Sequence, residues 1–112
     1  LLNLQPYDEA INNLVAVATR DGARYPITYY HLARLYEMKG EIKLAEAAFV
    51  KAAPRNPQFL VEVTRVGEKL GDYKGSLDAM EQYLNLMEKQ GEKPTWSDQR
   101  LAELRTKAAK QQ

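Results

Sequence analysis

Apolar residues recur along this chain at helical rather than strand spacing. In the first such segment Tyr7, Ile11, Leu14 and Ala18 follow at i, i+4, i+7 and i+11, which places them on one stripe of a helix. The same pattern predicts helices over about 7–20, 28–39, 42–53, 58–70 and 73–89, and a last one from residue 97 onward. No segment alternates with the period of a strand, so we predict an all-α fold.

Glycine and proline mark the ends of these helices. Gly22 and Gly40 follow the last periodic residue of their helices and are expected to act as C-terminal stops. Pro54 and Pro57 separate the third helix from the fourth, with residues 55–56 as the turn between them. The chain therefore divides into short helices joined by tight connections.

The last helix differs from the others in its narrow apolar stripe. Ser97 is expected to be its N-cap, and Leu101, Leu104 and Ala108 form one thin apolar face under a strongly charged surface. Trp96, just before it, is placed to cover the end of a core. This pattern is typical of the capping helix that ends a stack of repeats.

One pattern of large and small residues occurs twice. The second helix carries large, large, small and large residues at fixed spacings, and the fourth helix repeats them 34 residues later. The two sets are Tyr29, Leu32, Ala33 and Tyr36, and Val63, Val66, Gly67 and Leu70. This self-similarity indicates repeated helix hairpins, which bury their apolar faces by stacking on neighbours.

These residues resemble the tetratricopeptide repeat family. The best match is a full repeat over 26–59, with a second repeat over 60–93, a half repeat over 1–25 and a capping helix over 95–112. In the second repeat Gly71 comes about three residues earlier than Gly40 does in the first, so its first helix or its turn is shortened. The residues that carry the match are Tyr29, Leu32, Ala33, Tyr36, Gly40, Ala45, Phe49, Ala52 and Pro57, then Val63, Val66, Gly67, Leu70, Ser76 and Met80, with Ala10 and Leu14 in the half repeat.

The resemblance implies a right-handed α-solenoid of antiparallel helix hairpins whose concave face holds a peptide or helix of a partner. Carried over by position, the residues expected on that face are Ile27, Tyr30, His31 and Arg34, then Val61, Glu62 and Arg65. Exposed Tyr and Arg are residue types that anchor interfaces. The chain lacks the asparagines and lysines of the family's carboxylate clamp, so we do not expect it to bind chaperone C-termini.

Composition and charge exclude several other classes. The 112 residues suit one small domain, and a net charge of +1 provides no field that favours nucleic acid or anionic lipid. No run of 18 apolar residues predicts a membrane span. The first residues, Leu1–Gln5, are too short and uncharged for a signal peptide, and they suggest a segment of a longer chain whose compartment the sequence does not indicate.

The sequence provides little material for catalysis. Cysteine is absent and His31 is the only histidine, which argues against metal sites and thiol or histidine chemistry. Ser76 and Ser97 are at a packing position and a helix start, so neither is expected to be a nucleophile. The carboxylates alternate with lysines and arginines on solvated helix faces. We therefore predict no enzyme activity, no cofactor and no metal.

Two functions remain from different classes. The first is a scaffold that holds a protein or peptide partner on the concave face. The second is an assembly module that self-associates, or stacks end to end, through exposed repeat ends. RNA binding is a third possibility, but Arg34 and Arg65 alone make a thin basic stripe beside Glu37 and Glu62.

Overall fold

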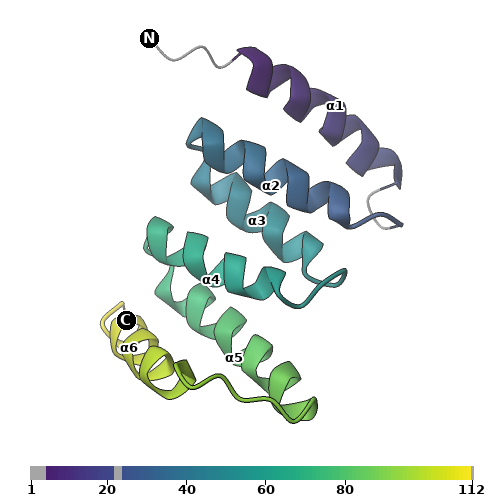
Figure 1. Cartoon of the computed structure of the whole chain (residues 1–112). Helices are drawn as coiled ribbons and strands as arrows, with labels where there is room; N and C mark the ends of the chain where they lie inside the picture. Colours follow the sequence, from purple (N-terminus) through teal and green to yellow (C-terminus); the bar gives the residue numbers. More distant parts are fainter. Residues whose placement is uncertain (1–4, 22–23, 112) are drawn as a thin grey trace. The chain divides into compact units, whose positions relative to one another are not determined.

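The computed structural model describes residues 5–21 and 24–111 and contains six helices and no strand within them (Figure 1). This confirms the all-α prediction for the described part. The predicted bounds agree with the observed ones to within two residues, and the stop predicted at Gly22 lies outside the described residues. The helices are α1 (Gln5–Asp21), α2 (Ile27–Lys39), α3 (Ile42–Ala52), α4 (Phe59–Leu70), α5 (Tyr73–Lys89) and α6 (Ser97–Ala109).

The chain forms two compact units, one ending at Phe59 and one beginning at Leu60, and each is described by itself. Among the described helices, none has the length and apolar character needed to cross a membrane.

The first unit is built on the hairpin of α2 and α3. Alanines bring the two helices close together, and Phe49 is fully buried between them. Helix α1 packs on α2, with Ile11 and Ala18 buried. The hydroxyl of Tyr29 donates to the carbonyl of Ala18 at 3.5 Å, which fastens α2 to the last turns of α1. The buried residues of the hairpin are Leu32, Ala33, Ala45, Ala48, Phe49 and Ala52.

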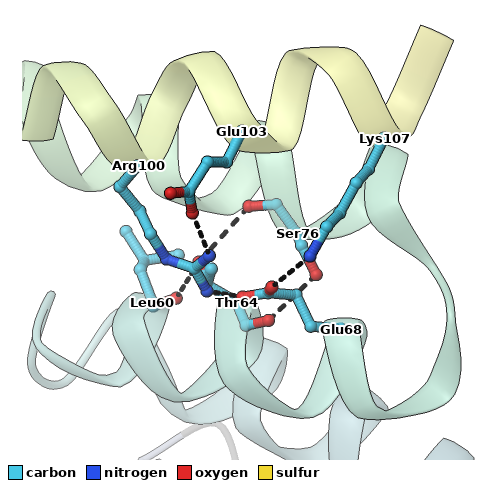
Figure 2. Close-up of polar contacts among 7 residues, drawn as sticks. All are labelled: Leu60, Thr64, Glu68, Ser76, Arg100, Glu103 and Lys107. Carbon is cyan, nitrogen blue, oxygen red and sulfur yellow. Dashed lines mark hydrogen bonds and ion pairs between the residues drawn. The ribbon is translucent and has the colours of Figure 1, made fainter.

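The second unit is built on the hairpin of α4 and α5, and its centre contains hydroxyl groups. The hydroxyl of Ser76 donates to the carbonyl of Thr64 at 2.9 Å, and the hydroxyl of Thr64 lies 3.1 Å from the Leu60 carbonyl and 3.3 Å from that of Ser76 (Figure 2). Both side chains are buried. Buried hydroxyls are stable only when they find such partners. Val63, Val66, Met80 and Tyr83 complete the core.

Three helices end in the same way. Gly40, Gly71 and Gly91 have φ values of 90°, 86° and 78°, a left-handed conformation that glycine adopts without a Cβ clash. The amide of the residue after each glycine reaches back five residues and satisfies a carbonyl that the helix leaves free. These bonds join Glu41 to Tyr36 (2.8 Å), Asp72 to Gly67 (2.7 Å) and Glu92 to Met87 (2.9 Å).

The shared glycine caps change the sequence offset between the two hairpins from the predicted 34 residues to 31. Both hairpins have a two-residue turn, so the early position of Gly71 reflects a shorter first helix: α4 ends at Leu70, whereas α2 continues three residues beyond Tyr36. Leu70, the counterpart of Tyr36 in the 34-residue pattern, is 41% exposed and lies outside the core. Aligned on their caps, the hairpins are offset by 31 residues, which pairs Ala33 with Thr64, Ala45 with Ser76 and Phe49 with Met80.

Helix α6 packs on α5 and is tied to α4 by charge. Arg100 and Lys107 of α6 both pair with Glu68 of α4, the latter with 3.8 Å between Nζ and Oε2 (Figure 2). Beyond its end, the Gln111 side chain bridges the turn between α4 and α5, donating to the Gly71 carbonyl and accepting from the Tyr73 amide.

The expectation that Ser97 is the N-cap of α6 is wrong. Trp96 occupies that position, and Ser97 is the first helical residue. Its hydroxyl points back and donates to the carbonyl of Pro94 at 2.8 Å, and the residue is buried. The proline turn before the helix supplies an acceptor, so Ser97 secures the connection instead of capping the helix.

Candidate functional site

The first candidate surface is the solvent-facing side of α2, which we call the α2 outer face. It consists of Ile27, His31, Arg34 and Met38, at i, i+4, i+7 and i+11. All four are exposed, and the two large apolar side chains are 38% and 54% exposed respectively. Three of the predicted partner-binding residues therefore share one face. Met38, which extends that face, was not among the predicted residues.

Tyr30 does not belong to the α2 outer face. Its side chain is half-buried, and its ring stacks on Phe59, with 4.6 Å between centroids and 8° between planes. The ring also lies 6.0 Å from Phe49 and 5.6 Å from His31. The expectation of an exposed anchor is therefore wrong for this residue, because its ring contributes to packing within the unit. Of the four aromatic rings in contact here, only that of His31 belongs to an exposed residue.

The second candidate surface lies in the other unit, on α4. Val61 and Glu62 are half-buried and Arg65 is exposed. The guanidinium of Arg65 donates from Nε and Nη2 to one oxygen of Glu62, at 3.2 and 2.7 Å. The two residues are one turn apart on the same helix, so the cation predicted to bind a partner, Arg65, is paired with Glu62 within the helix.

A pocket of about 290 Å³ adjoins this part of α4. Val61 and Arg65 line it, together with Trp96 and Arg100 from the region of α6. Trp96 is 44% exposed, so it only partly covers the core, contrary to its predicted role. The sequence analysis missed Arg100 because its position depends on how α6 docks, which no local pattern reports.

A third surface is an apolar groove, and the sequence analysis had assigned three of its lining residues, Tyr29, Leu32 and Tyr36, to a buried stripe. It has a volume of about 250 Å³ and is lined by residues of α1, α2 and α3. We call it the α1–α3 groove. Its lining residues are Val15, Ala18, Thr19, Tyr29, Leu32, Tyr36, Leu44, Ala47, Ala48 and Lys51. Tyr29 and Tyr36 are only half-buried, because they form its floor.

The described residues contain no group of three or more His, Asp or Glu side chains placed to hold a metal ion. The ammonium of Lys39 donates a hydrogen bond to the carboxylate of Asp8, and this contact between helices raises the pKa of Lys39 above its ordinary value of 10.5. The two side chains are 2.5 Å apart, between the first turn of α1 and the last turn of α2.

No protein-family model matches this chain, and no curated protein matches it.

Proposed function

We propose that this chain is a protein-interaction scaffold of tetratricopeptide-repeat type, in which each unit offers one exposed helix face, on α2 or on α4, to a peptide or helix of a partner. Two helix hairpins with identical glycine caps and small residues at their crossing points support this proposal. So do two exposed faces that combine apolar side chains with arginine, a composition common at the energetic centres of interfaces.

The α2 outer face is the observation on which the proposal depends most. Ile27 and Met38 expose large apolar side chains on the same stripe as Arg34. A partner that covers this stripe would bury both apolar side chains and could accept several hydrogen bonds from the guanidinium of Arg34.

The test is affinity capture from the native source with the wild-type chain beside an Arg34→Glu, Arg65→Glu variant. We expect the same prey to be retained by the wild type and lost from the variant, because both substitutions reverse a charge on the proposed faces. A matched control, Lys74→Glu with Lys110→Glu, reverses two exposed cations elsewhere.

Circular dichroism of each variant controls for loss of structure, since Arg65→Glu places a like charge one turn from Glu62 at a cost of about 0.2–0.5 kcal/mol. Prey that both variants retain equally would reject these faces as the binding site.

Self-association is the second candidate, because α1 keeps an apolar stripe only half-buried. Tyr7, Ala10, Leu14 and Val17 lie along one side of this helix at i, i+3, i+7 and i+10. A second copy packed against that side would bury them. Sedimentation equilibrium over a range of concentrations distinguishes the two: a monomer throughout favours the scaffold, and a reversible dimer favours assembly.

A further inference from the structure

The α1–α3 groove is open on the side of α2 opposite to the α2 outer face. Its floor residues Tyr29, Leu32 and Tyr36 occupy one side of α2, whereas His31 and Arg34 point to the other, as the helical period requires. A ligand in this groove would therefore leave the α2 outer face free. The two surfaces can be tested independently.

The walls of the groove expose apolar side chains. Val15 of α1 is 39% exposed and Leu44 of α3 is 48% exposed, and both line the groove. Ala47 and Ala48 keep the α3 wall low, so the tyrosine rings of the floor remain accessible. At roughly 25 cal/mol for each Å² of apolar surface removed from water, covering such a groove gives a favourable free energy.

The charge of the groove has one sign. Lys51 is the only charged side chain among the described residues that line it, and its ammonium lies 5.3 Å from the centroid of the Tyr29 ring. The carboxylate within α3, Glu46, projects from the opposite side of that helix. The α1 wall has no acidic residue between Ala10 and Thr19. A cation at the edge of an apolar groove favours an acidic ligand.

We propose that the α1–α3 groove binds an acidic amphipathic helix of a partner protein, with aliphatic side chains on the tyrosine floor and a carboxylate paired with Lys51. The proposal shares with the scaffold function only the idea of a protein partner, and it adds a second docking surface and the chemistry of its ligand. A helix with the same apolar face and basic flanks would place like charges at Lys51, so the groove discriminates against it.

The test uses two short fluorescein-labelled amphipathic peptides with the same leucine stripe, one carrying glutamates and one lysines on its flanks. Fluorescence polarisation measures their binding to the wild-type chain. We expect saturable binding of the acidic peptide alone. Lys51→Glu should weaken it about tenfold and allow the basic peptide to bind instead, because the substitution reverses the charge at the edge of the groove.

Two variants of α3 separate groove binding from general surface effects. Leu44→Asp places a charge in the groove and should weaken the acidic peptide by at least about tenfold. Val50→Asp is the matched control: this valine is 52% exposed on the same helix but does not line the groove, so affinity should be unchanged. Lys43→Glu is the corresponding control for Lys51→Glu.

The peptide and assembly measurements can each overturn the proposal. Equal binding of both peptides, no binding of either, or insensitivity to Leu44→Asp would reject it. A wild-type dimer that Leu44→Asp converts to a monomer would assign the groove to a second copy of the chain. None of these results bears on Arg34 or Arg65, so failure here leaves the scaffold test intact.

Discussion

The two units carry similar hairpins, but a third helix covers each hairpin in a different way. In the first unit, α1 contacts the hairpin through Ile11 and Ala18 and leaves the α1–α3 groove open beside it. In the second, α6 is drawn to its hairpin by the pairing of Arg100 with Glu68. One hairpin thus borders an apolar groove, whereas the other has a pocket lined partly by arginines beside its charged third helix. The flanking helix therefore decides what kind of surface a hairpin offers to a ligand.

The hairpins also differ where their helices cross. The first has Ala33 and Ala45, which are fully buried and carry no polar side-chain atom. At the equivalent places the second has Thr64 and Ser76, whose hydroxyls are satisfied by carbonyls of the facing helix. Small size is common to both pairs and permits close approach, whereas the hydroxyls add a directional constraint on the register.

The largest expected effect comes from truncating the large side chain buried between the two helices of each hairpin. Phe49→Ala should lower the free energy of unfolding by about 3–5 kcal/mol, because the ring is fully buried and a cavity would remain. Met80→Ala, its counterpart, should cost about 2–5 kcal/mol. Urea denaturation measures both. A loss below about 1 kcal/mol at either position would contradict the equivalence of the hairpins.

Removing the hydroxyls tests whether they account for the difference between the two helix crossings. Thr64→Ala and Ser76→Ala each delete a buried donor, with an expected cost of about 1–3 kcal/mol. The double variant should cost less than the sum, because it reproduces the pair of alanines found in the first hairpin. A double-mutant cycle from urea titrations gives the coupling. Strict additivity would show that the two hydroxyls act independently.

Loss of the Glu68 carboxylate should affect α6 and not α1. Glu68→Gln removes the acceptor of Arg100 and Lys107 and should destabilise the docked α6 by about 0.5–1 kcal/mol, since the pairs are partly solvated. Amide hydrogen exchange should quicken in α6 while α1 is unaffected. Raising the salt concentration should also quicken exchange in α6 of the wild type. Unchanged exchange in α6 would show that packing on α5 alone holds it.

The smallest effect is expected at high pH, in the first unit. Because Asp8 raises the pKa of Lys39, the folded state holds the proton more tightly than the unfolded chain does. This contribution is therefore complete below the ordinary value of 10.5 and is lost as the pH rises through the raised value. Thermal unfolding across this interval should show a decline that Asp8→Asn reduces. The same decline in that variant would exclude the pair as its cause.

Several parts of the fold could be predicted because they depend on local sequence. Gly40 and Gly71 end their helices through a backbone conformation that glycine adopts readily, and the adjacent residues fix the cap. The exposure of His31 and Arg34 follows from the helical period once the buried face is known. The narrow stripe of α6 was also correct: Leu104 and Ala108 are buried.

Other predictions failed where the helical period alone does not decide what a side chain contacts. Tyr30 was expected to be exposed, but Phe59, 29 residues later, stacks on its ring. Ser97 was expected to cap α6, but the carbonyl of Pro94 accepts its hydroxyl. The 34-residue pattern placed Leu70 in the core, although the cap at Gly71 ends the helix before that residue can be covered. Only the first of these interactions is distant in sequence; the other two are local contacts at helix ends that the periodicity does not report.

The sequence by itself determined which segments are helical, where they stop and which side of each helix is apolar, because these depend on interactions within a few residues. Only the tertiary structure decided whether an apolar side would be covered. Tyr29 and Tyr36 have the periodicity of core residues, yet they form the floor of an open groove because of where α1 and α3 lie. Burial depends on the positions of neighbouring helices, which the spacing of residues along one helix does not specify.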